Sequence, residues 1–319
     1  VMHPLVKALL SSWEWRLEIV AVLLTLGALY TLGWFRLRRQ SKRGQLANWP
    51  RLLSYYAGLA ILAVSLLSPI DRLGGQLFFM HMLQHMLSIM LAAPLLLLAN
   101  PFPFMVWALP AALRMRVASL FSQPSGFRRG LAAVTRPFIV WLIFLTVYLG
   151  WHDASLYDLA LRQDWVHDIQ HITFFGAAML FWWHVIGAAP RIHRKRSGWA
   201  SMAYLIGVIP PNMAVAVTIA FAPNVIYTYY LSAPRIWGFT ALQDQMISGA
   251  IMWIPGSMMF LLAALIILAR MFMSKEPLPV RPEGWDADDK FIAPGLEHRV
   301  VQNRWKQLKA ANSHGADSA

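Results

Sequence analysis

The chain has 319 residues, of which 58% are hydrophobic and only 13% are charged, with a net charge of +13. Soluble domains carry about a quarter charged residues, so this composition predicts a polytopic membrane protein in a lipid bilayer. In such a protein the excess positive charge is typical of cytoplasmic loops, and no nucleic-acid partner is expected. The chain contains no cysteine, which excludes disulfides, thiolate metal sites, iron–sulfur clusters and a cysteine nucleophile.

Seven apolar stretches approach the roughly 20 residues that a helix needs to cross a bilayer core. They cover residues 17–35, 52–70, 77–99, 137–151, 169–189, 200–222 and 246–272. The fourth is short, and Pro210-Pro211 should kink the sixth. Residues 102–112 are apolar but short and broken by prolines, so we expect them to lie at the membrane interface. The fold class predicted is all-α, a bundle of seven transmembrane helices within residues 1–275.

The charges of the loops predict the orientation of this bundle. Loops 36–51, 100–136 and 190–199 contain several basic residues and no acid, whereas the acids before the seventh stretch fall in the alternate loops or the N-terminal segment. By the positive-inside rule, the N-terminus lies outside and the C-terminus lies in the cytoplasm of a bacterial cell, with the bundle in its cytoplasmic (inner) membrane. No cleavable signal peptide is expected, because arginines follow the first apolar stretch rather than precede it. Residues 276–319 are polar and predict a cytoplasmic tail with one short helix near 295–310.

Histidines gather near the outer ends of the predicted helices. His81 and His85 enter the third stretch, His167 and His171 open the fifth, and His152 ends the fourth. Both pairs have i, i+4 spacing, so each pair points to one side of its helix. Two facing pairs could offer four imidazoles to one ion or to two close ions.

The residue types around these histidines suit a metal ion. Imidazole binds copper, zinc, iron and nickel, and thioether sulfur is soft enough for Cu(I). Asp153 and Asp168 could ligate the ion or orient ring N–H groups. The candidate metal ligands are His81, His85, His152, His167, His171, Asp244, Met82 and Met86.

Several of these residues also have a purely structural interpretation. A single histidine near the interface is more often a hydrogen-bonded structural residue, and most methionines pack or face lipid. His184 is expected near the cytoplasmic side in a structural role, with a haem or proton role as the lesser alternative. The remaining histidines are expected to be solvated: His3, His193, His298 and His314. The motif "HDIQH" is similar to a zinc-hydrolase His-Glu-x-x-His, but the shorter aspartate and the missing third ligand disfavour that interpretation.

Three motifs together resemble one family. They are "HMLQHMLSIMLAAPLLLL", the run "WH…LYDLAL…H…QH" and "DQMISGAIMWIPG". In combination and order they are similar to the CtaG family of integral-membrane cytochrome c oxidase assembly factors, over about residues 15 to 272. The same name is used for an unrelated single-span, cysteine-dependent copper chaperone, which this cysteine-free chain does not resemble. The resemblance implies seven helices and copper handling for a haem–copper oxidase. By position, the family's histidine pairs correspond to His81, His85, His167 and His171. Its single histidine corresponds to His152, and its acid–glutamine pair corresponds to Asp244 and Gln245.

The leading hypothesis is therefore a non-enzymatic assembly factor and metallochaperone. It would receive copper at the outer face, with an extracytoplasmic copper donor protein as a further partner, and pass it to haem–copper oxidase subunits. A haem-binding membrane cytochrome is an alternative, although haem would normally lie deeper in the bundle than these histidines. A metal permease would need polar residues across the whole membrane, and a structural subunit of a respiratory or photosynthetic complex remains a further class.

Overall fold

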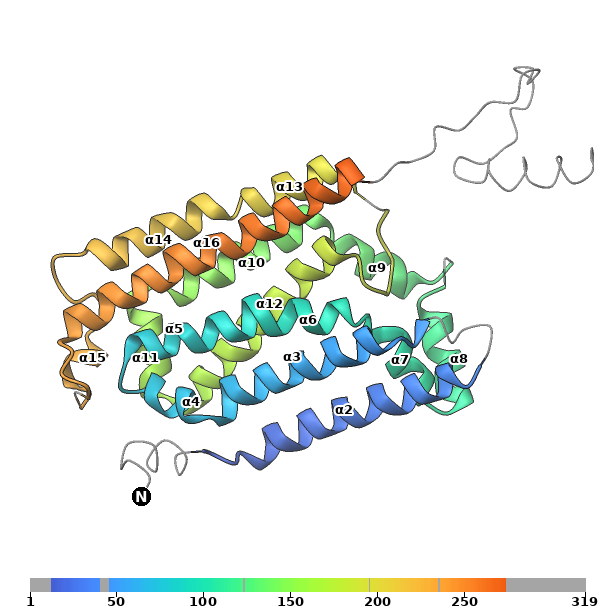
Figure 1. Cartoon of the computed structure of the whole chain (residues 1–319), viewed down its shortest axis with the longest axis horizontal. Coiled ribbons are helices and arrows are strands. Elements are labelled where there is room, and N and C mark those ends of the chain that lie inside the picture. Colours follow the sequence, from blue (N-terminus) through green and yellow to red (C-terminus); the bar gives the residue numbers. More distant parts are fainter. Residues whose placement is uncertain (1–12, 41–45, 123, 195, 235, 274–319) are drawn as a thin grey trace, which may run out of the picture. The chain divides into compact units, whose positions relative to one another are not determined.

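The computed structural model describes residues 13–273, apart from residues 41–45, 123, 195 and 235. The chain divides into two compact units, Val1–Ala269 and Arg270–Ala319, and the first of these contains the helical bundle. Every regular element among the described residues is a helix, which confirms the all-α prediction (Figure 1). The predicted tail 276–319 and three of the histidines, His3, His298 and His314, lie outside the described residues.

Six helical segments are long and apolar enough to cross a membrane, and a bent pair brings the number to as many as seven within the described residues. The six are α2 (Leu17–Arg38), α3 (Trp49–Leu67), the run α5–η2–α6 (Phe78–Met86, Leu87–Ala92, Ala93–Leu98), α12 (Asp164–Ile186), the pair α13–α14 (Gly198–Ile206, Ile209–Phe221) and α16 (Ala241–Met273). The bent pair is α9 (Gly126–Val134) with α10 (Pro137–Trp151), at 53°. It contains the short fourth stretch. The sixth segment is interrupted at Gly207 and Val208, next to the two prolines expected to kink it.

Short helices lie at the two ends of the bundle. Figure 1 shows α4 (Pro69–Gly74), α11 (Ala154–Arg162) and α15 (Tyr229–Ser232) at one end, together with the starts of α5 and α16. At the opposite end lie α7 (Pro101–Ala108), α8 (Ala111–Leu120) and α9. The connections that carry acids are therefore at one end and the arginine-rich connections at the other, as the topology predicted from loop charge requires.

Residues 102–112 fold mostly into α7, which packs closely against α2. A Cβ added to Gly33 of α2 would lie 1.7 Å from the Phe104 carbonyl oxygen, so only glycine allows this approach. Arg36 near the end of α2 donates a 2.6 Å hydrogen bond to the Ala108 carbonyl at the end of α7. These contacts attach α7 to the bundle through the backbone of α2.

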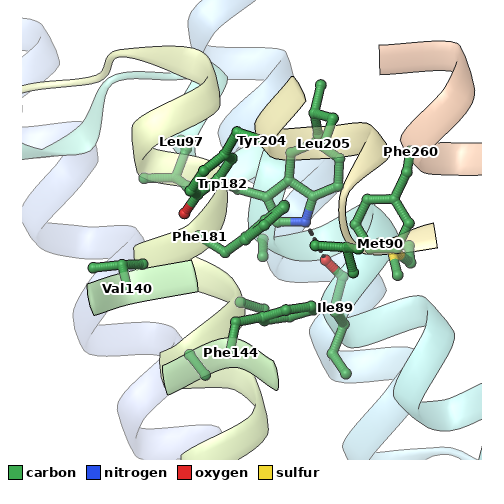
Figure 2. Close-up of a cluster of buried hydrophobic side chains, with 14 of the residues drawn as sticks. Ile89, Met90, Leu97, Val140, Phe144, Phe181, Trp182, Tyr204, Leu205 and Phe260 are labelled. Carbon is green, nitrogen blue, oxygen red and sulfur yellow. Dashed lines mark hydrogen bonds between the residues drawn. The ribbon is translucent and has the colours of Figure 1, made fainter. Parts of the chain in front are cut away.

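The third segment contains a π-helical turn, η2, and one backbone carbonyl of this turn is bonded from outside the segment. In π-helical register the carbonyl of Ile89 would accept a hydrogen bond from the residue five positions later, but that residue is Pro94, which has no N–H. The indole of Trp182 on α12 donates to this carbonyl instead, at 2.9 Å. Figure 2 shows this bond among the buried side chains. It joins the third segment to α12 below the histidine pairs, where an unpaired carbonyl would be costly.

An aromatic core holds α10, α12 and α16 together around this bond. The rings of Phe144 and Phe181 are 4.6 Å apart between centroids, and the Trp182 and Phe260 rings lie 5.9 Å apart and nearly parallel (Figure 2). Nearer the start of α16, Gly249 approaches α14 so closely that an added Cβ would lie 2.5 Å from the Ala220 nitrogen. The helices that carry the histidines are thus fixed by packing beneath them.

Candidate metal centre

Four histidine side chains meet between α5 and α12. Within each helix the i, i+4 pair is in contact through Nε2 atoms, 2.7 Å apart in His81 and His85 and 3.1 Å apart in His167 and His171. Between the helices, the ring centroids of His81 and His167 are 5.3 Å apart, and those of His85 and His171 are 4.9 Å apart. We call these four residues the histidine quartet.

The quartet is largely shielded from solvent, and its rings are bonded to each other. His81 is 1% exposed and His85 is 7% exposed, while His167 and His171 are half-buried. Over the described part of the chain, no three His, Cys, Asp or Glu side chains already surround one point as the ligands of a metal ion. Two nitrogen ligands on a tetrahedral ion lie about 3.3 Å apart, given metal–nitrogen distances near 2.0–2.1 Å. The 2.7 and 3.1 Å separations are slightly shorter, so small ring rotations would convert each hydrogen-bonded pair into a pair of ligands.

Two buried glutamines accompany the quartet, and the sequence reasoning did not single them out. Gln84 and Gln170 are both 0% exposed, each directly before the second histidine of its pair. The Gln84 side chain donates to Asp71, and within the described part of the chain its side-chain oxygen Oε1 has no hydrogen-bond partner. Among the residues that the structure describes, neither polar atom of the Gln170 amide has a well-formed hydrogen bond, although the side chain lies beside His81. The signal was in the sequence, because His-x-x-Gln-His occurs twice, at residues 81–85 and 167–171.

Asp71, which accepts the hydrogen bond from Gln84, lies in α4. Burial raises the pKa of its carboxyl to about 6, and the nearby Glu14 and Asp168 act in the same direction. Gln84 and the charge of Arg16 oppose this shift. Asp71 is therefore a carboxyl that can be neutral in mildly acidic conditions.

Asp168 contacts Arg16 rather than a histidine ring. Nη1 and Nη2 of Arg16 each donate a 2.9 Å hydrogen bond to one carboxylate oxygen of Asp168, and Arg16 also bonds Glu18. The Asp168 bond is the main reason that the pKa of Arg16 is raised. This two-point ion pair attaches the start of α2 to α12 one residue after His167.

Two other predicted acids cap helices. The carboxylate of Asp244, predicted as a metal ligand, accepts hydrogen bonds of 2.9 Å from the backbone N–H groups of Phe78 and Phe79 at the start of α5. Asp153, predicted to ligate or to orient a ring, caps α11 by accepting from Ser155 and Leu156. In the structure both acids belong to helix N-termini, where a carboxylate satisfies free N–H groups. Gln245 fixes the preceding loop by accepting from the Ile226 N–H at 2.7 Å.

A tyrosine covers the quartet on the side of α11. The ring of Tyr157 lies 5.1 Å from that of His81, and its neighbours Tyr227 and Tyr230 are also fully buried. Burial raises the pKa of Tyr157. These three tyrosines are part of the packing beside the histidines.

Three of the predicted ligands lie outside the quartet. They are His152, Met82 and Met86. His152 Nδ1 hydrogen-bonds the Tyr148 carbonyl at 2.6 Å, and the Phe174 ring lies beside both the His152 ring and the His85 ring. A cavity of about 30 Å³ opens next to His85, and its wall includes His152, Met82 and Met86. The predicted ligands thus fall into two adjoining groups, the quartet and the cavity wall.

The histidines at the opposite end of α12 form a separate contact. His184 Nε2 hydrogen-bonds the Thr135 carbonyl at 2.8 Å, in keeping with the structural role predicted for it. His193 was predicted to be solvated, which is wrong: it is half-buried and its Nε2 lies 3.0 Å from the Thr135 hydroxyl. Burial lowers its pKa.

Long apolar helices with a polar centre near one end are the features of a multi-pass helical membrane protein. The chain belongs to the cytochrome c oxidase caa3 assembly factor family (Caa3_CtaG), whose family model matches residues 28–274. This confirms the family resemblance stated from the motifs.

Two curated relatives are uncharacterized proteins from Mycobacterium bovis and Mycobacterium tuberculosis. Each is 25% identical over 262 residues, a match that covers 78% of this chain. The match covers only 38% of each relative, so the chain spans less than half of their length. No solved structure matches the chain.

Proposed function

We propose that this protein assists oxidase assembly by binding copper as cargo in the histidine quartet and passing it to the catalytic subunit. The observation that supports this proposal is the meeting of two i, i+4 histidine pairs, His81/His85 and His167/His171, in a buried space between α5 and α12. The protein acts as a carrier and catalyses no reaction. Its partners are the haem–copper oxidase subunits and an extracytoplasmic copper donor.

The donor set favours copper or zinc over ions that prefer oxygen ligands. Neutral imidazole binds copper and zinc well, whereas Mg²⁺ and Ca²⁺ prefer oxygen ligands. Asp168 is held by Arg16, and Asp244 caps α5, so we assign neither to the ligand set. Four neutral nitrogens add no negative charge, which suits an ion that must later leave. Membership of an oxidase assembly family then selects copper, because the oxidase catalytic site requires it.

The proposal also requires the quartet to lie on the outer side of the membrane. The arginine-rich loops 36–51, 100–136 and 190–199 support this orientation by the positive-inside rule. Cysteines introduced singly at Arg39, Arg128 and Arg194 should be labelled only from the cytoplasm in this cysteine-free chain. Labelling of any of these sites from outside would contradict the orientation.

A haem-binding cytochrome is the alternative class. The stacked rings of His85 and His171, 4.9 Å apart between centroids, lie directly against each other and leave no space for a porphyrin between them. An absorption spectrum of the purified protein separates the classes. We expect no Soret band, and a stoichiometric one would favour the cytochrome.

Complementation tests the proposed function in cells. A host that lacks this protein should regain oxidase activity and oxidase-bound copper with the native chain. The variant His85→Ala, His171→Ala should be present in the membrane but should leave the oxidase short of copper. His193→Ala, which changes a half-buried histidine at the other end, is the control and should complement fully. Full maturation with the double variant would contradict the proposal.

A further inference from the structure

The cavity beside the quartet has a wall rich in sulfur. It lies among α5, η2, α10, α12, α14 and α16, and its volume is about 30 Å³. Four of the thirteen residues that line it are methionine, against 16 in the 319-residue chain, which is an enrichment well beyond its share. They are Met82, Met86, Met90 and Met252, and the imidazoles of His85 and His152 complete the donor set.

These methionines come from two helices that face each other across the cavity. Met82 is 2% exposed and Met252 is 4% exposed, so both are sheltered from lipid. The sulfur of Met86 on α5 reaches α16, because a Cβ added to Gly256 would lie 3.7 Å from it. Gly256 therefore leaves room for this sulfur at the cavity.

The polar groups of the wall are mostly engaged already. Asn212 accepts from the Tyr148 hydroxyl at 2.8 Å and donates to the Met252 carbonyl and the Ser257 hydroxyl. His152 uses Nδ1 for the Tyr148 carbonyl, and among the described residues its Nε2 has no hydrogen bond. A buried water needs two to four polar partners, which this wall does not supply. Thioethers and a free imidazole nitrogen instead match a soft cation.

We propose that this cavity is a second metal position, specific for Cu(I) and held by thioether sulfur from Met82, Met86 and Met252 with His152 Nε2. This inference rests on the proposed function, since it takes copper to be the cargo. His85 belongs both to the quartet and to the cavity wall, so an ion can pass between the two by exchange of ligands. The copper stays Cu(I) throughout this exchange, and no electron or proton acceptor is required.

Cu(I) binding to the detergent-purified full chain under anaerobic conditions tests the inference. Affinity is measured by competition with bicinchoninate, and X-ray absorption at the copper edge identifies sulfur neighbours. In Met82→Leu, Met252→Leu, which nearly conserves volume, we expect sulfur neighbours to be lost and Cu(I) affinity to fall by about tenfold or more. Met258→Leu, at a 61% exposed position of α16, is the matched control and should behave like the native chain.

The quartet variant His81→Ala, His167→Ala separates this inference from the proposed function. It should lose the copper that has only nitrogen neighbours and retain the Cu(I) that has sulfur neighbours. Two results would overturn the second position without affecting the proposal for the quartet. One is X-ray absorption that finds only nitrogen neighbours around copper in the native chain. The other is an unchanged number of sulfur neighbours in the double methionine variant. Sulfur-bound Cu(I) that is unaffected by any quartet variant, with no copper of only nitrogen neighbours in the native chain, would instead refute the quartet. Circular dichroism and gel filtration check that each variant is folded.

Discussion

Arg16 and Asp168, 152 residues apart in the chain, are joined by two parallel hydrogen bonds of 2.9 Å. The pair holds the start of α2 against α12, immediately beside His167. Bidentate arginine–carboxylate pairs have a defined geometry, so this one restricts the rotation of α12 at the quartet.

Arg16→Gln should weaken copper binding more than it weakens the fold. Both side chains are partly exposed, at 32% and 41%, so the ion pair contributes only about 0–1 kcal/mol to stability after solvent screening. Copper affinity should fall several-fold, because His167 loses its neighbouring anchor. Competition titration with a copper chelator measures the affinity. Glu18→Gln, which removes only the exposed second partner of Arg16, is the control, and equal effects of the two variants would contradict this role.

Asp244→Ala should destabilise the protein. The change leaves the N–H groups of Phe78 and Phe79 without their acceptor at a buried helix start, and an unsatisfied buried group costs about 1–3 kcal/mol. Thermal unfolding in detergent measures the loss, with the exposed Asp164→Asn as control. A ligand role for Asp244 would give a different result, in which copper is lost while stability is unchanged.

Gln170→Leu should have opposite effects on stability and on copper. The substitution removes a buried amide that has no well-formed hydrogen bond among the described residues, so thermal stability should stay the same or rise. If Gln170 orients the His81 ring when copper binds, affinity should fall by about 10–100-fold, as for other residues that position metal ligands. The exposed Gln163→Leu serves as the control. A variant that loses stability and keeps its copper affinity would contradict this assignment.

Asp71→Asn should change how stability depends on pH. A carboxyl whose pKa rises from 3.8 in the unfolded chain to about 6 in the folded protein favours folding when protonated. Its contribution is therefore complete below pH about 4 and is lost as the pH rises through about 6. Asparagine can still accept from Gln84 and does not ionise. The variant should be more stable than the native chain at pH 7.5 and similar at pH 4, and a difference independent of pH would contradict the assignment.

The long apolar helices and the gathering of the paired histidines at one end of the bundle could be predicted from the sequence, because apolar runs and loop charges follow directly from the order of residues. The pairing of His81 with His85 and of His167 with His171 followed from helical spacing. What could not be predicted was the direction in which each element faces. Asp244 caps α5 because a loop returns it to a helix start far away in the chain, and His152 turns toward a cavity because α10 ends with its ring bonded to Tyr148. Neither contact leaves a periodic signal.

Copper content of the purified protein tests the central claim most directly. The native chain and the variant His85→Ala, His171→Ala are purified in detergent, loaded with copper, washed with a weak chelator and analysed by mass spectrometry of the metal. His193→Ala is treated in parallel, and circular dichroism verifies that all three are folded. We predict that the native chain and His193→Ala retain the same amount of copper per chain, whereas the double variant loses the copper of the quartet and retains clearly less. An unchanged ratio of copper to protein in the folded double variant would contradict this prediction.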